Sequence, residues 1–184
     1  MRITCPKQVI FEYYSGIYTT GGFEPRVQCS AKAYDSAADL MELGQCIKPL
    51  FEIGEFSVPG IFAQYCYAPD DHVNKNSVFT LVSWENAYKF GRPTLKKDTL
   101  DCQGKLWKLS KMTMENFKAS ERYEKLIYRP VDYCREMGIS QSNYDKIWSK
   151  KERAMTNGLR DLSNEVIEPI RQRINEINNL KKAC

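Results

Sequence analysis

The feature that most restricts the fold of this chain is a regular apolar stripe in its C-terminal part. Apolar side chains recur there at steps of three and four residues: Leu159, Leu162, Val166, Ile170, Ile174 and Ile177. This spacing places them on one face of an α-helix. Pro169 lies inside the stripe and predicts either two helices divided at that residue or a bent one. The stripe can pack on the chain's own core or pair with a second copy; Pro169 favours the former, and the oligomeric state stays open.

Other segments also have helical patterns. Helices are predicted over residues 36–54, where Ser36 can cap the first turn, over 59–66 and over 105–128. The segments 9–22 and 77–82 have strand as well as helix propensity, and their periodicity does not decide between the two. The fold is therefore predicted to be mainly α, with a helical N-terminal body that has room for a short pair of strands.

Charge is distributed unevenly along the 184 residues. Residues 1–101 contain 10 basic and 12 acidic side chains, whereas residues 102–184 contain 17 basic and 11 acidic ones. The charged, turn-rich segment 96–104 lies where the balance changes. It predicts two domains, residues 1–100 as an aromatic-rich body and residues 101–184 as a basic domain that favours contact with nucleic acid.

The overall composition is that of an ordinary folded protein, with 42% hydrophobic and 27% charged residues. No run of about 18 apolar residues is present, and residues 1–10 lack the apolar core of a secretory signal. We therefore expect a cytoplasmic location and no membrane contact.

The scarcity of histidine argues against most catalytic sites. A Ser–His–Asp or Cys–His site would have to use His72, which lies in the polar segment 68–76, expected to be an exposed loop. The 7 cysteines are odd in number, widely spaced and without a C-x-x-C pair, which is typical of reduced thiols rather than of a zinc site. We predict that the chain is not an enzyme and has no metal and no cofactor.

The segment 130–151 has the pattern of two short helices joined by a tight turn. Pro130 can begin the first helix, Gly138 suits the turn, and Ser140 can cap the second helix. Cys134 is the small residue expected where the helices cross. The side chains expected to face inward are Tyr133, Met137, Ile139, Tyr144 and Ile147.

These offsets resemble the helix-turn-helix family of DNA-binding proteins. Residues 135–142 (R-E-M-G-I-S-Q-S) and the segment 152–162, which follows without a winged hairpin, are similar to the sigma-factor region that reads the −35 promoter element and to the DNA-binding part of phage late-gene antiterminators. Two positions depart from the family pattern: Cys134 stands where Ala is usual, and Tyr144 where a β-branched residue is typical. The resemblance implies a sequence-specific transcription regulator with double-stranded DNA and RNA polymerase as partners.

A DNA-binding role requires polar and basic side chains on the outer face of this segment. Gln and Ser side chains can bond base edges, whereas Lys and Arg suit phosphates. The candidate DNA-binding residues are Arg129, Arg135, Ser140, Gln141, Ser142, Asp145, Lys146, Ser149, Lys150, Lys151 and Arg153.

A small helical protein-interaction module, an inhibitor or adaptor that binds another protein and no nucleic acid, is the alternative hypothesis. Tyrosine is a common interface residue, and the N-terminal half is rich in it. The tyrosines concerned, which can equally belong to an ordinary core, are Tyr13, Tyr14, Tyr18, Tyr65 and Tyr67.

Overall fold

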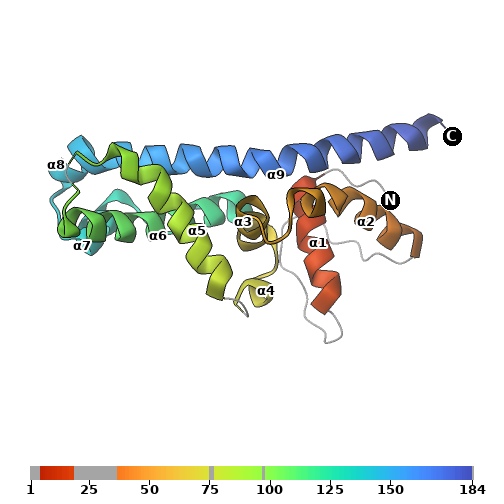
Figure 1. The fold of residues 1–184 in the computed structure, drawn as a ribbon, viewed down its shortest axis with the longest axis horizontal. Helices are drawn as coiled ribbons and strands as arrows, with labels where there is room; N and C mark the ends of the chain where they lie inside the picture. The colour runs from red at the N-terminus through yellow and green to blue at the C-terminus, as the bar shows by residue number, and fades with distance from the viewer. Residues whose placement is uncertain (1–4, 19–36, 75–76, 97, 184) are drawn as a thin grey trace. The chain divides into compact units, whose positions relative to one another are not determined.

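The computed structural model describes residues 5–18, 37–74, 77–96 and 98–183. Their secondary structure is α-helical with short 3-10 and π segments, and these residues form no strand (Figure 1). The mainly α prediction is confirmed. The predicted strand pair is wrong for the described residues, because residues 9–18 and 77–82 lie in helices; residues 19–22 and Ser36 lie outside the described residues.

The chain divides into two compact units. One, called here the terminal unit, consists of Met1–Phe79 and Leu162–Cys184; the other, the central unit, is Thr80–Asp161. The sequence analysis instead placed one boundary near residue 100. The charge asymmetry is the same with the observed units. The central unit contains 17 basic and 11 acidic residues, and the terminal unit contains 10 basic and 12 acidic residues.

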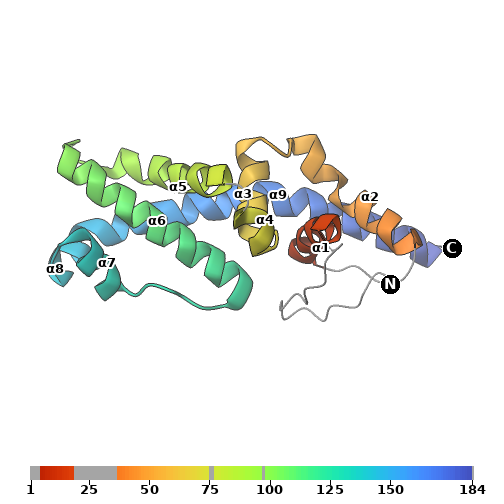
Figure 2. The same cartoon turned by 90° about the horizontal axis from the view of Figure 1, so that it is seen from below.

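The terminal unit contains α1 (Pro6–Tyr18), α2 (Ala37–Ile53), α3 (Val58–Tyr67), α4 (Asp70–Asn74) and the second part of α9 (Ser149–Ala183). In Figures 1 and 2, α1, α2 and α3 gather along this part of α9. The helices bury one face each. The core side chains include Val9, Ile10, Tyr14, Leu43, Ile47, Leu50, Phe62, Tyr65, Val166, Ile170 and Ile174.

The C-terminal stripe is buried within the chain itself. Its residues from Leu159 to Ile177 are at most 7% exposed, and α9 runs through Pro169 without a break. The predicted division into two helices is therefore wrong. An internal proline costs about 3 kcal/mol, whereas each buried Val or Ile side chain contributes about 1.5–3 kcal/mol. The buried Val166, Ile167 and Ile170 around the proline offset its cost.

Tight backbone approach fixes the entry to α3. Ser57 caps this helix by accepting a hydrogen bond from the backbone N–H of Gly60 at 3.2 Å. A Cβ on Gly60 would lie 2.2 Å from the Gly54 carbonyl oxygen, so only glycine fits there. The polar loop predicted over residues 68–76 is partly a short helix, α4, because Val73 is buried and anchors it. The His72 side chain lies outside the described part.

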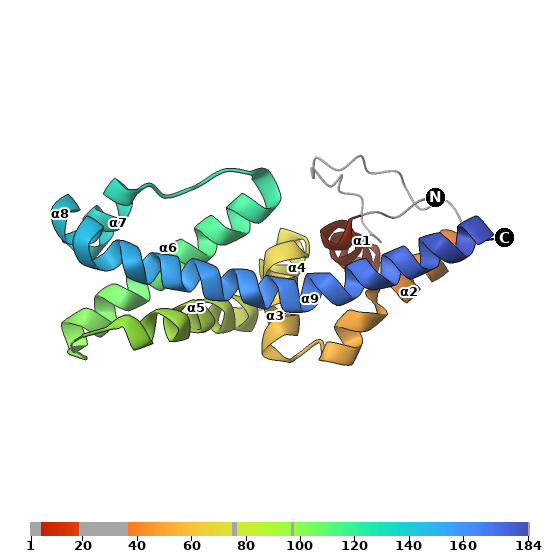
Figure 3. The ribbon, with the colours of Figure 1, turned by 90° about the horizontal axis from the view of Figure 1, so that it is seen from above.

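The central unit contains α5 (Ser77–Gly91), a 3-10 turn η1 (Arg92–Thr94), α6 (Leu100–Tyr123), α7 (Pro130–Met137), α8 (Gln141–Asn143), a π segment η2 (Tyr144–Trp148) and the beginning of α9; Phe79 is the last α5 residue assigned to the terminal unit. Figure 3 shows α7 and α8 beside the first turns of α9, with a long connection that returns to α7 from the C-terminal end of α6. The core of the central unit is a cluster of buried side chains: Leu106, Leu109, Met112, Tyr133, Cys134, Met137, Tyr144, Trp148 and Met155.

Candidate nucleic-acid interface

The turn between α7 and α8 has the local features that the sequence indicates. Pro130 occupies the first turn of α7, which ends at Gly138 with a left-handed φ of 65°. Ser140 then caps α8, its hydroxyl accepting a hydrogen bond from the Asn143 backbone N–H at 3.3 Å. Tyr133, Cys134, Met137 and Tyr144 are buried, as expected. These contacts place α8 at a fixed angle to α7.

A stacked tyrosine pair holds the two helices together. The rings of Tyr133 and Tyr144 are nearly parallel, with centroids 5.6 Å apart. The Tyr144 hydroxyl donates to the Glu152 carboxylate on α9. Burial, followed by this carboxylate, raises the pKa of Tyr144 well above its ordinary value, and burial likewise raises the pKa of Tyr133. The Tyr144 phenol therefore keeps its proton and its hydrogen bond to Glu152, whereas the Tyr133 hydroxyl accepts a hydrogen bond from the Asn116 amide.

Asn116 on α6 positions the approach to α7. Its side-chain amide donates to the Tyr128 carbonyl oxygen at 2.8 Å and to the Tyr133 hydroxyl at 2.7 Å. Its oxygen accepts from the backbone N–H groups of Ile127 and Tyr128 at 2.9 and 2.8 Å. Because all four hydrogen bonds are made by one buried side chain, the loop before α7 is fixed to α6. The sequence does not indicate this role of Asn116, since a single Asn in a helix has no distinguishing pattern.

The second helix differs from the predicted one at Ile147. The sequence analysis placed Ile147 inward, but its side chain is 50% exposed, and Trp148 is buried instead at 5%. The cause is η2, because a π turn contains more residues than an α turn and moves the inward position one residue along the chain. A second difference is continuity: α8, η2 and α9 follow one another from Gln141 to Ala183 without a break.

Most of the candidate DNA-binding residues lie on the exposed side of this segment. Exposed members are Arg129, Arg135, Ser140, Gln141, Ser142, Asp145, Lys146, Lys150 and Arg153, whereas Ser149 is half-buried. Lys146, Lys150 and Arg153 are spaced four and three residues apart and therefore share one helix face. Within the described chain their side chains form neither an ion pair nor a hydrogen bond with another residue.

Several neighbouring polar groups are already engaged. The Gln141 amide donates to Asp145 Oδ1 at 2.9 Å, and its oxygen accepts from the Cys134 thiol at 3.4 Å. The Ser149 hydroxyl donates to the Asp145 carbonyl oxygen at 2.7 Å. Arg135 lies 3.7 Å from Asp132 on its own helix. These bonds orient the face without neutralising its cations at Lys146, Lys150 and Arg153.

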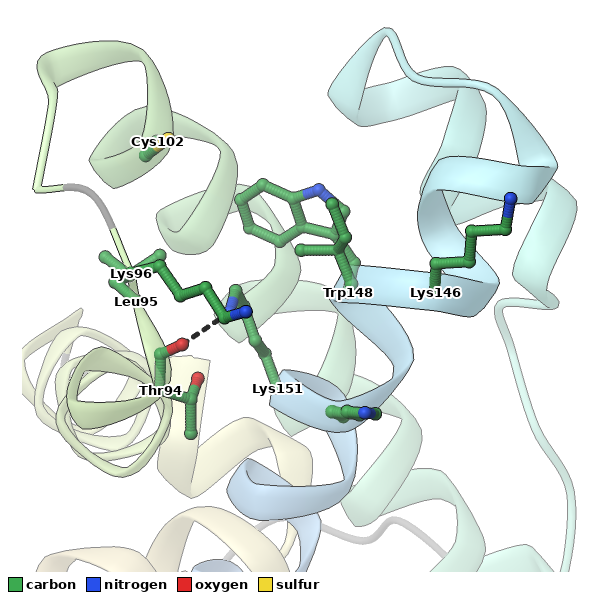
Figure 4. Close-up of a pocket in the computed structure, with 9 residues that line it drawn as sticks. Thr94, Leu95, Lys96, Cys102, Lys146, Trp148 and Lys151 are labelled. Atoms are coloured by element: carbon green, nitrogen blue, oxygen red, sulfur yellow. Dashed lines mark hydrogen bonds between the residues drawn. The ribbon is translucent and has the colours of Figure 1, made fainter.

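Lys151 requires a correction. The sequence analysis placed it with Lys150 on the exposed basic flank, but its side chain is buried and only 5% of it is exposed. Its ammonium donates to the Thr94 carbonyl oxygen at 2.7 Å, as Figure 4 shows. The neighbouring residues Lys150 and Lys151 therefore differ in exposure, since Lys150 stays exposed whereas Lys151 is buried.

Beside Lys151 lies a cavity of about 520 Å³. It is lined by Thr94, Leu95, Lys96, Cys102, Lys146, Ile147, Trp148, Lys150 and Lys151, all in the central unit. In Figure 4, Lys96 and Lys151 extend toward the same Thr94 carbonyl, while Lys146 points away from them beyond Trp148. The cavity adjoins the exposed basic face because Lys146 and Lys150 belong to both.

The described residues contain no group of three or more His, Cys, Asp or Glu side chains that could hold a metal ion. No described helix combines the length and apolar character needed to cross a membrane.

Comparisons of the chain with models of known protein families, with curated proteins and with solved structures found no match.

Proposed function

We propose that this chain binds double-stranded DNA through the exposed face of α8, η2 and the first turns of α9. The observation that carries the proposal is the set of unpaired cations Lys146, Lys150 and Arg153 on one helix face. Seven residues of helix separate the first from the last, a span of about 10 Å, comparable with the major-groove width of about 12 Å. Release of counterions from DNA phosphates would drive binding by these cations.

The residues at the start of α8 support contacts with base edges in addition to contacts with phosphates. The first residues of a recognition helix reach base edges in helix-turn-helix proteins. Gln141 and Ser142 occupy that place and are exposed. The bonds of Gln141 to Asp145 and Cys134 leave its amide one N–H and one acceptor lone pair, and adenine presents the complementary pair in the major groove.

The biological role proposed with this binding is transcription regulation, with antitermination on RNA polymerase as its specific form. Selection of bound duplexes from a random-sequence pool tests the sequence-specific part. The wild-type chain is expected to enrich a short motif, and Gln141→Ala to lose preference at one base pair while still binding DNA. Ser120→Ala, an exposed change on α6, is the matched control. A wild-type pool that stays random contradicts sequence-specific binding.

A protein partner is the second candidate function, favoured by exposed apolar side chains on the terminal unit. Phe56 is 79% exposed, and Phe51 and Val58 beside it are 40% and 43% exposed. The tyrosines of the alternative hypothesis contribute less, since Tyr14, Tyr65 and Tyr67 are core. Tyr13 is half-buried, and the Tyr18 side chain lies outside the described part.

Sedimentation with purified bacterial RNA polymerase tests this second function. Phe56→Ser is expected to weaken co-sedimentation, whereas Leu180→Ser, a change of another exposed apolar residue on α9, should leave it unchanged. Equal binding by both variants would exclude the Phe56 surface as the contact.

A further inference from the structure

The cavity beside Trp148 combines an apolar wall with several lysine side chains. Leu95, Ile147 and Trp148 supply apolar surface, and Lys96, Lys146, Lys150 and Lys151 supply positive charge. In the described part of the chain, no acidic side chain lines it. Its volume of about 520 Å³ is within the range that holds small organic ligands.

Charge in this cavity is incompletely compensated. The Lys151 ammonium has one neutral acceptor, the Thr94 carbonyl oxygen, and lies 5.7 Å from the centre of the Trp148 ring. Burial lowers the pKa of Lys151 from its ordinary value, Cys102 acts in the opposite direction, and the Lys96 cation lowers it again. A buried cation that faces a second cation is stabilised when an anion joins them.

We propose that this cavity binds a small amphipathic anion, with a carboxylate or phosphate head between Lys96 and Lys151 and an apolar body against Leu95, Ile147 and Trp148. Charged hydrogen bonds to the head supply specificity, and removal of the body from water supplies affinity. This site does not rest on DNA binding, because the anionic head is placed between Lys96 and Lys151, whereas the proposed DNA interface is formed by Lys146, Lys150 and Arg153.

The test uses octanoate and 1-naphthyl phosphate as probes, which separate an aliphatic carboxylate from an aromatic phosphate. Isothermal titration measures affinity, and alkylation of Cys102, read by peptide mass spectrometry, reports occupancy because this thiol lines the cavity. At a probe concentration ten times the dissociation constant, alkylation of Cys102 is expected to slow about tenfold. Cys5, which is half-buried in the terminal unit, should be alkylated at an unchanged rate.

Variants separate a charged site from a merely apolar one. Lys96→Gln and Lys151→Met should each weaken the better probe about tenfold, whereas Lys125→Gln, an exposed change in the same unit, should not. Lys96 is exposed, so its variant remains informative if Lys151→Met fails to fold. Absence of binding by both probes, equal protection of Cys102 by octanol, or unchanged affinity in Lys96→Gln would overturn the proposal.

Discussion

The two units of this chain are held together in different ways. The terminal unit buries regular apolar faces, including the stripe of α9, and its close approaches are backbone to backbone, as at Gly60. The central unit adds a polar network to its core, in which Asn116, Tyr133, Tyr144 and Glu152 set the orientation of α7 and α8. The terminal unit also has polar contacts, such as the Tyr67–Ser163 hydrogen bond at 2.6 Å and the bond from the Gln64 amide to the Glu55 carbonyl oxygen at 2.9 Å. The difference is that the polar network of the central unit orients the candidate interface, whereas the polar contacts of the terminal unit accompany the packing of its apolar faces.

Backbone crowding in the terminal unit gives the largest expected effect. In Gly60→Ala the added Cβ would meet the Gly54 and Glu55 carbonyl oxygens, which belong to the backbone and cannot rotate away. We expect a loss of about 3 kcal/mol in the free energy of unfolding, measured with denaturant. The control is Gly44→Ala, where nothing lies within 4 Å of the new Cβ; a gain of about 0.5–1 kcal/mol is expected there. Equal effects at the two glycines would show that packing is not tight at Gly60.

The polar network of the central unit gives the next largest effect. Asn116→Ala leaves the Ile127 and Tyr128 backbone groups and the Tyr133 hydroxyl without their partner. A loss of about 2–3 kcal/mol is expected, together with faster amide exchange at Ile127 and Tyr128. Asn157→Ala, an exposed change on α9 in the same unit, should stay within about 0.5 kcal/mol of wild type. Unchanged amide exchange at Ile127 in Asn116→Ala would show that the Asn116 side chain does not fix the loop before α7.

Alkaline pH gives a smaller effect, which reports on the polar network of the central unit. Tyr144 has a raised pKa in the folded chain because it is buried and donates to Glu152, whereas an unfolded tyrosine ionises near its ordinary pKa of 10.0. Below that pH both states are protonated and the stabilisation is complete. Above it the unfolded state releases the proton first, so the free energy of unfolding falls as pH rises.

Denaturant titrations between pH 9 and pH 11 measure this slope. Tyr144→Phe should flatten it by about 1 kcal/mol per pH unit above the unfolded pKa. Tyr123→Phe is the control, since Tyr123 is 48% exposed. Identical slopes in the two variants would mean that the Tyr144–Glu152 bond does not hold its proton.

Local signals in the sequence were sufficient to predict the turn between α7 and α8. Pro130, Gly138 and Ser140 each act through the backbone of their own turn, and each occupies the predicted position. The period of the stripe in α9 predicted its helical face, and Pro169 favoured the packing of this face on the chain's own core. Contacts between distant residues were not predictable in this way: the Lys151 bond to Thr94 spans 57 residues, and the four bonds of Asn116 depend on how the loop returns to α6.

The π segment and the division into units were likewise not predictable from local sequence patterns. One extra residue in the turn at η2 exchanges Ile147 for Trp148 in the core, although both are apolar and either satisfies the sequence pattern. The boundary predicted at residue 100 relied on charge and turn composition. It could not reveal that the C-terminal part of α9 completes the unit formed by the N-terminal helices.

The salt dependence of DNA affinity tests the proposed interface most directly. The affinity for a labelled duplex is measured by fluorescence anisotropy from about 50 to 200 mM salt. The test variant is the triple substitution Lys146→Gln/Lys150→Gln/Arg153→Gln. The control variant, Lys89→Gln/Lys125→Gln/Arg160→Gln, removes the same charge from other exposed positions of the central unit. The first variant should bind more weakly, with a log–log slope smaller by about 3, and the second should retain the wild-type slope. Equal slopes in the two variants, or no DNA binding by the wild-type chain, would contradict an interface formed by Lys146, Lys150 and Arg153.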